Sequence, residues 1–309
     1  MLRSLFIWLS GNKAVRGWAE RSRMGQRLAA RFVAGTTVEE AVAACRRVNA
    51  EGIAVTLDWL GESVAVEAEA RASAEVYQRL LDAIAAQGLN ANVSLKLSQM
   101  GMDIATSLAE QIVGEVVERA AAVRSFVRID MEGSSYTEAT VAMTERLYAR
   151  FPGSVGTVLQ AYLYRTEADA ERLLAQGIRI RLCKGAYREG PEVAFPAKPD
   201  VDRNYVKLMK RMVSFANAGA GVFCGIATHD EAIVEQMLAF VAERGVARSG
   251  FEFQMLYGVR RDLQRRLARE GFGVRVYLPF GTAWYPYFMR RLAERPANLI
   301  FLAKNFFRN

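Results

Sequence analysis

Short apolar or β-branched runs recur along this chain, and a helical pattern follows most of them. The helical stretches, for example 75–87 and 107–122, place apolar residues every three or four positions, as amphipathic helices do. The runs between them have the length and composition of strands, and they cover 52–59, 91–99, 126–132, 156–162, 178–187, 222–230, 251–258 and 274–281. Strands that alternate with helices pair in parallel through crossovers, so the pattern predicts an α/β protein with a closed (β/α)8 barrel of the TIM type.

The repeat starts near residue 51, and no Pro/Gly/Ser-rich linker interrupts it. We therefore predict N-terminal helices over 1–50, covering the bottom of the barrel, and a catalytic barrel over 51–309, the two forming one domain. A doubly wound sheet is the alternative. It would leave two sheet edges uncovered, and the chain has no GxGxxG motif for it.

Composition supports a globular protein of a reducing compartment. The chain has 309 residues, of which 51% are hydrophobic and 24% charged. Cys45, Cys183 and Cys224 lie far apart without metal-ligand spacing, and there is a single histidine, so we expect neither disulfides nor a metal site. The apolar run near the N-terminus is too short for a signal peptide or a spanning helix, which predicts a soluble, cytoplasmic protein.

The net charge of +8 is concentrated at the two ends of the chain. Residues 1–33 carry seven Lys and Arg against Glu20, and residues 275–309 carry six against Glu294. A solvated basic surface would explain this, and so would an anionic partner. No nucleic-acid-binding motif is present, so an anionic membrane surface or an acidic small molecule fits better than nucleic acid.

Polar side chains stand at the predicted carboxyl ends of the strands, where barrel enzymes hold their active sites. In chain order they are Asp58, Lys96, Asp130 with Glu132, Gln160, Arg181 with Lys184, Thr228 with His229, Gln254 and Tyr277. Charges buried at such a rim must be paired or must bind a ligand. If the pair Arg290 and Arg291 also reaches this rim, cations outnumber carboxylates there, and the rim is expected to bind an anion.

The chemistry of this rim points to a cofactor-dependent reaction. The turn KGAY at 184–187 brings small residues to a strand end, where backbone N–H groups can approach a phosphate. No Ser–His–acid arrangement is found, and Asp130 and Glu132 share one strand and one face, whereas a glycosidase needs carboxylates on separate elements. A large anionic cofactor and a small anionic substrate suit hydride transfer.

Two other functions stay open on the residues alone. One is a phosphate-binding lyase or isomerase that uses Lys96 or Lys184 as a Schiff-base lysine. The other is a basic membrane or scaffold protein without catalytic activity.

Five motifs, taken together, resemble the proline dehydrogenases, flavoenzymes with a distorted (β/α)8 barrel. They are SLKLSQMG, RIDME, RIRLCKGAYRE, ATHD and YLPFGTAWYPYFMRRLAERPAN, and the resemblance spans roughly residues 30–300. It implies a monofunctional, bacterial-type enzyme that binds FAD. The implied reaction oxidises L-proline to Δ1-pyrroline-5-carboxylate, the first step of proline catabolism, by hydride transfer from C5 to N5 of FAD. A quinone is the implied electron acceptor, with peripheral contact at the inner face of the cell membrane.

The resemblance also implies roles for individual residues. It makes Asp130 and Arg181 catalytic, with Asp130 the charge partner of Lys96 and Arg181 near the flavin N5. The implied substrate pocket contains Lys96, Leu256, Tyr277, Arg290, Arg291 and Glu294, the arginines pairing with the proline carboxylate. The implied flavin contacts are Met131, Gln160, Arg181, Lys184, Gly185, Ala186, Thr228 and His229.

The pair Arg290 and Arg291 sets a geometric condition on the fold. In a regular barrel the helix after the eighth strand runs down the outer wall, away from the mouth. Arg290 lies about ten residues past the eighth predicted strand, too far along such a helix to reach a substrate. If the pair binds a carboxylate, the eighth helix must be displaced across the barrel mouth.

Overall fold

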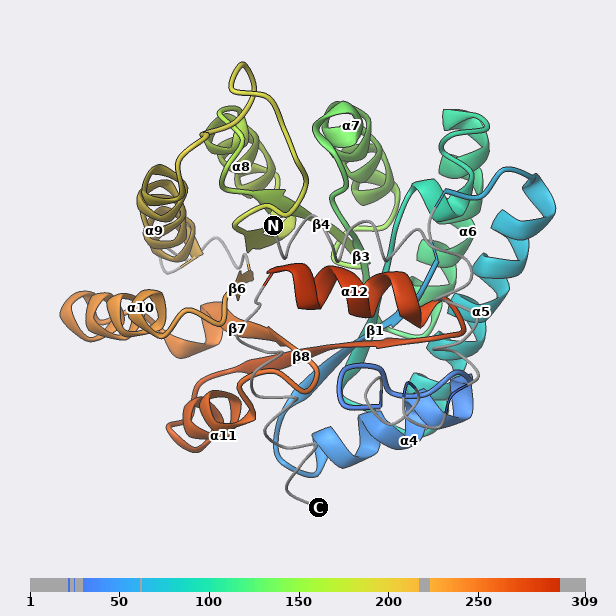
Figure 1. Ribbon diagram of the computed structural model, residues 1–309, viewed down its shortest axis with the longest axis horizontal. Helices are drawn as coiled ribbons and strands as arrows, with labels where there is room; N and C mark the ends of the chain where they lie inside the picture. The colour runs from blue at the N-terminus through green and yellow to red at the C-terminus, as the bar shows by residue number, and fades with distance from the viewer. Residues whose placement is uncertain (1–21, 23–24, 26–29, 62, 217–222, 295–309) are drawn as a thin grey trace.

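The computed structural model describes residues 22, 25, 30–61, 63–216 and 223–294. Its centre is a closed barrel of eight parallel strands in sequential order (Figure 1). The strands are β1 (Ala54–Trp59), β2 (Ala91–Leu95), β3 (Val127–Ile129), β4 (Val155–Gln160), β5 (Arg179–Cys183), β6 (Cys224–Ala227), β7 (Phe251–Leu256) and β8 (Val274–Phe280). The prediction of a (β/α)8 barrel is confirmed.

The barrel closes between β8 and β1, whose register runs from Ala54 opposite Arg275 to Trp59 opposite Phe280. Each strand is shorter than the run predicted for it. β1 begins later than predicted and ends at Trp59 as predicted, whereas in the other strands the chain turns away before the carboxyl end of the predicted run. After β5, Gly185 adopts a φ of 114°, which a glycine tolerates and which ends the extended segment. After β2 the chain enters a 3-10 turn, η1 (Ser98–Met100).

Helices pack around the barrel and bury its outer face (Figure 1). They are α4 (Val38–Asn49), α5 (Glu67–Ala86), α6 (Thr106–Ala122), α7 (Ser134–Arg150), α8 (Thr166–Ala175), α9 (Lys198–Phe215), α10 (Glu231–Arg244) and α11 (Arg261–Arg269). Two large hydrophobic clusters fill the space between these helices and the strands. None of the described helices is long and apolar enough to cross a membrane.

Helix α4 lies in the outer ring, between α5 and α11 (Figure 1). It begins with a capping box in which Thr37 and Glu40 bond each other's backbone N–H groups. It packs against β1, β8 and α5, on the wall where the helix after β8 belongs in a regular barrel. The expectation that the N-terminal residues cover the bottom of the barrel is therefore wrong for α4.

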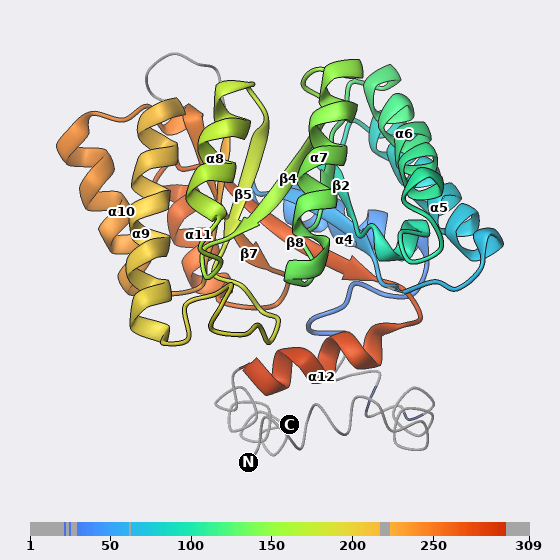
Figure 2. The same ribbon diagram turned by 90° about the horizontal axis from the view of Figure 1, so that it is seen from above.

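The helix after β8, α12 (Trp284–Glu294), lies across the carboxyl end of the barrel (Figures 1 and 2). Gly281 allows this turn with a φ of 126°, and a Cβ there would lie 3.1 Å from the Trp59 ring. The displaced eighth helix is confirmed. The side chains of Arg290, Arg291 and Glu294 lie outside the described part of the chain.

A segment before α4 packs against α12. Phe32 and Val33 join Leu60 in a cluster with Trp284, Tyr285, Tyr287, Phe288 and Met289, and the rings of Phe32 and Phe288 are 6.0 Å apart. The backbone N–H of Ala34 donates to Pro279 O at 2.9 Å, and that of Gly281 donates to Gly35 O at 2.9 Å. The chain from 32 to 35 thus ties α12 to the end of β8.

Candidate active site

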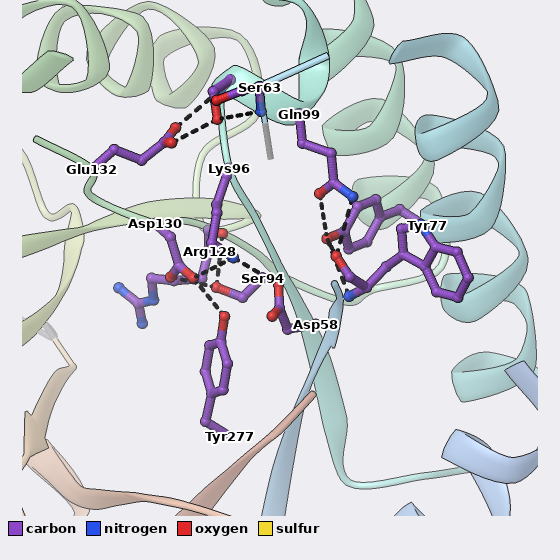
Figure 3. A network of polar contacts seen from close by, with 12 residues as sticks. Asp58, Ser63, Tyr77, Ser94, Lys96, Gln99, Arg128, Asp130, Glu132 and Tyr277 are labelled. Carbon is purple, nitrogen blue, oxygen red and sulfur yellow. Dashed lines mark hydrogen bonds and ion pairs between the residues drawn. The ribbon is translucent and has the colours of Figure 1, made fainter. Parts of the chain in front are cut away.

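Asp130, directly after β3, is the centre of a polar network inside the barrel mouth (Figure 3). Its Oδ1 accepts hydrogen bonds from Ser94 Oγ at 2.6 Å and from Arg181 Nη1 at 2.9 Å. Its Oδ2 accepts one from the Tyr277 hydroxyl at 2.7 Å. Donors from β2, β5 and β8 therefore converge on one buried carboxylate, as expected when parallel strands end at a common rim.

Lys96 bridges this carboxylate to a second one. Its Nζ lies 3.2 Å from Asp58 Oδ1 and 4.0 Å from Asp130 Oδ2. Asp58 is almost fully buried, and its Oδ2 has no hydrogen-bond partner among the described residues. Burial raises the pKa of Asp58; Lys96 opposes this rise and Asp130 adds to it.

Tyr277 remains a protonated donor. Burial, followed by the negative charges of Asp130 and Asp58, raises the pKa of its phenol well above the ordinary value. The guanidinium carbon of Arg181 lies 5.1 Å from the centre of the phenol ring, so the two side chains make a cation–π contact.

Arg181 keeps one donor available. Its Nη1 is bound to Asp130 and its Nε donates to Gln254 Oε1 at 2.5 Å, whereas its buried Nη2 has no partner among the described residues. Arginine presents a rigid fork of donors, and a buried donor left unpaired costs free energy. This arrangement fits a ligand with an acceptor atom, such as the ring of a flavin, placed against Arg181.

The turn after β5 brings Lys184, Gly185 and Ala186 to the same end of the barrel. A Cβ on Gly185 would lie 2.4 Å from the ring of Tyr162, so only glycine fits this close approach. Lys184 Nζ contacts Asp202 Oδ1 at 2.6 Å and Asp230 Oδ2 at 3.0 Å. The turn can therefore offer backbone N–H groups to a phosphate, but the charge of Lys184 is already shared by two carboxylates.

The expectation that Asp130 and Glu132 share one face is wrong, because β3 ends at Ile129 and the two side chains diverge (Figure 3). Glu132 accepts hydrogen bonds from Ser98 N at 3.0 Å and Ser98 Oγ at 2.6 Å. It holds the turn after β2 instead of joining the Asp130 network. Its backbone carbonyl accepts from Gln160 Nε2 at 2.8 Å, and Met131 beside it is buried.

His229 and Thr228 shape the ends of β6 and β7. His229 Nε2 accepts a hydrogen bond from Leu256 N at 2.9 Å, which ties the end of β7 to this loop. Thr228 Oγ1 accepts one from Asp230 N at 3.1 Å, next to the carboxylate that binds Lys184. Leu256 is half-buried at the end of β7, on the same rim.

A second polar layer beneath the rim was not predicted. Arg275 Nε donates to Glu252 Oε1 at 2.6 Å, and Arg275 Nη1 donates to Asn92 Oδ1 at 2.8 Å. Arg128 Nη1 donates to the carbonyls of Thr157 at 2.9 Å and Arg179 at 2.6 Å. Arg128, Glu252 and Arg275 stand two positions before predicted rim residues, and Asn92 stands four before Lys96. A period of two within each strand is therefore the signal that identifies them.

The described residues contain no cluster of His, Cys, Asp and Glu suited to a metal ion. A closed parallel barrel with charged groups gathered at its carboxyl end is the architecture of (β/α)8-barrel enzymes. Proline utilization A (PutA) from Bdellovibrio bacteriovorus, solved after inactivation by N-propargylglycine, has the same fold. The TM-score is 0.81 at 23% identity, over 92% of this chain and 34% of that one.

The sequence comparisons define the family. The proline dehydrogenase family model matches residues 41–304. Proline dehydrogenase 1 of Bacillus subtilis is 42% identical over 306 residues, covering 98% of both chains. Proline dehydrogenase of Deinococcus radiodurans is 40% identical over 307 residues, covering 94% of this chain and 96% of its own. The chain belongs to the proline dehydrogenase family, a family of oxidoreductases, and the resemblance recognised in its motifs is confirmed.

The buried charge of Asp58 leads to a prediction about stability. Its pKa in the folded state is raised, so ionised Asp58 opposes folding above that pKa, and the cost disappears below the pKa of the unfolded state. Lys96 would keep Asp130 as a partner if Asp58 were neutral. We expect Asp58→Asn to raise the free energy of unfolding at neutral pH by about 1 kcal/mol, the gain vanishing near about pH 4.

Urea titrations across pH measure this gain. Asp262→Asn is the matched control. Arg260 lowers the pKa of this exposed carboxylate, so removing its charge should lower the free energy of unfolding at neutral pH. A loss of stability in Asp58→Asn at neutral pH would show that the ion pair with Lys96 outweighs the cost of burial.

Proposed function

We propose that the protein is an FAD-dependent proline dehydrogenase that oxidises L-proline to Δ1-pyrroline-5-carboxylate in the first step of proline catabolism. Family membership supports the substrate and the cofactor class. The observation that carries the proposal at the level of residues is the Arg181–Asp130 pair, which is buried at the barrel mouth and leaves Arg181 Nη2 for a ligand. The lyase and scaffold alternatives lose support, since the family is one of oxidoreductases.

The proposed FAD site uses residues from four strand ends, those of β3, β4, β5 and β6. Arg181 directs its unpaired donor to the flavin ring, and Gln160 and Met131 line the ring from β4 and the end of β3. The turn Lys184–Gly185–Ala186 faces the phosphates, with Thr228 and His229 on the neighbouring strand end. Bound FAD supplies the hydride acceptor, its N5.

The proposed substrate site lies between this rim and α12. Lys96, Arg290 and Arg291 bind the proline carboxylate, and Glu294 orients an arginine of that pair. Leu256 and Tyr277 pack against the proline ring. Asp130 holds Lys96, Arg181 and Tyr277 in a single arrangement, so this chain acts mainly by positioning C5 of the substrate and by excluding water beneath α12.

An anaerobic titration with L-proline tests the proposed reaction. The purified protein should be yellow, and its flavin absorbance near about 450 nm should bleach in proportion to added proline, because the cofactor takes up the hydride. D-proline, which places the carboxylate on the wrong side of the ring, is the control ligand. Protein that contains no flavin, or flavin that L-proline leaves oxidised, would contradict the proposal.

The role proposed for α12 can be tested separately. Arg290→Ala and Arg291→Ala should each raise the KM for proline at least about tenfold, because a charge-assisted contact to the carboxylate is lost. Arg269→Ala removes an arginine that is exposed on α11 and should leave KM unchanged. KM values measured with an artificial dye as acceptor decide this, and unchanged values in both α12 variants would remove the pair from the substrate site.

We further propose that the reduced cofactor passes its electrons to a quinone at an anionic membrane surface. The support is the basic charge at both ends of the chain, within a net charge of +8. Binding to vesicles that contain anionic lipid should weaken as salt rises, because surface electrostatics are screened within a Debye length of about 10 Å at about 0.1 M salt. Sedimentation with vesicles measures it, and neutral vesicles are the control. Equal binding to neutral and anionic vesicles would refute the electrostatic part.

A further inference from the structure

Gln254, in β7, binds the proposed catalytic arginine through a different nitrogen from the one that Asp130 binds. Its Oε1 accepts a hydrogen bond from Arg181 Nε at 2.5 Å, and the residue is only 4% exposed. No expectation drawn from the motifs assigns Gln254 a role. Among the described residues it is nevertheless the only hydrogen-bond partner of Arg181 Nε.

The orientation of this amide is fixed from the layer below. Gln254 Nε2 donates to Glu252 Oε1 at 2.6 Å, and Arg275 Nε donates to the same oxygen at 2.6 Å. An ionised carboxylate only accepts hydrogen bonds, so the NH2 end of the amide must face Glu252. The carbonyl end must then face Arg181, which needs an acceptor.

Gly225 on β6 makes room for this arrangement. A Cβ at that position would lie 2.4 Å from Gln254 Nε2, so any larger residue on β6 would push the amide away. Arg275 is itself fixed, because its Nη1 donates to Val55 O at 2.9 Å and to Asn92 Oδ1 at 2.8 Å. The chain of contacts is therefore anchored in β1, β2 and β8.

The neutral amide has an electrostatic consequence for Arg181. Glu252 forms an ion pair with Arg275 in the polar layer beneath the rim. The amide of Gln254 lies between Glu252 and Arg181 and bonds to both. Arg181 thus shares its charge with a single carboxylate, Asp130, and keeps more positive charge for a ligand than it would beside two.

We propose that Gln254, oriented by Glu252, is a positioning residue for the oxidation reaction. It holds the guanidinium of Arg181 between Asp130 and the face of Tyr277, so that Nη2 is directed at the flavin. This inference rests on the proposed function, because it takes the ligand of Arg181 to be FAD.

Gln254→Met in the holoenzyme tests the inference, since methionine has a similar volume and no amide. We expect kcat for proline to fall about tenfold with KM within about twofold, because Arg181 orients the cofactor and not the substrate carboxylate. The second readout is the dissociation constant of sulfite, an anion that adds to the oxidised flavin and reports the positive charge beside it. It should rise about tenfold.

Two further variants complete the design. Glu252→Gln removes the charge that orients the amide and should move both readouts in the same direction by a smaller factor, and it carries the test if Gln254→Met does not fold. Gln99→Met is the matched control, because Gln99 is an equally buried amide bonded to Tyr77 and to Trp59 O. It should leave both readouts at the wild-type values.

The outcomes separate this inference from the proposed function. Wild-type protein whose flavin is not reduced by proline would overturn the proposed function. If wild type is reduced normally while folded Gln254→Met, or folded Glu252→Gln in its place, keeps the wild-type kcat and sulfite affinity, only the positioning role is overturned. A loss in Gln99→Met equal to that in Gln254→Met would also overturn it, because any buried amide would then have the same effect.

Discussion

The buried carboxylate of Asp130 is the group on which the arrangement of the barrel mouth depends. Ser94, Arg181 and Tyr277 all donate to it, and Lys96 lies 4.0 Å away. An ionised carboxylate is stable inside a barrel only when such donors and cations surround it. The same requirement fixes these four side chains relative to one another. A site that works by positioning its ligands needs that rigidity, and here the electrostatics of one buried charge provide it.

The second constraint is the exchange of helices at the outer wall. Helix α12 lies across the carboxyl end of the barrel and not on the outer wall (Figures 1 and 2). Helix α4 packs on that wall, against β8 and β1. The two placements depend on each other, because a helix must cover the apolar outer faces of β8 and β1 when α12 does not. The segment 32–35 connects them, since it precedes α4 and packs under α12. The covered mouth is thus coupled to the way in which the N-terminal part of the chain completes the barrel.

Rim residues could be predicted because parallel strands end at one edge, and Lys96, Asp130, Arg181 and Tyr277 do meet there. The pairing of Glu132 with Ser98 could not be predicted, because it depends on β3 ending at Ile129. The layer of Glu252 and Arg275 was missed for another reason. Strands buried on both faces show no alternation of apolar and polar residues, so these two side chains can be placed only by counting two positions back from the rim residues Gln254 and Tyr277. Register then brings Gln254 opposite Arg275.

The sequence by itself determined the barrel, the family and the types of side chain at the rim, because these follow from periodicity, strand ends and motifs. It also required a displaced eighth helix, if Arg290 and Arg291 are to reach a ligand. Only the tertiary structure decided the partners of each charge. Asp130 receives Arg181 while Lys184 pairs with Asp202 and Asp230, and Gln254 stands between Glu252 and Arg181. The physical reason is that ion pairing depends on distances of a few ångströms, which barrel closure and strand register set.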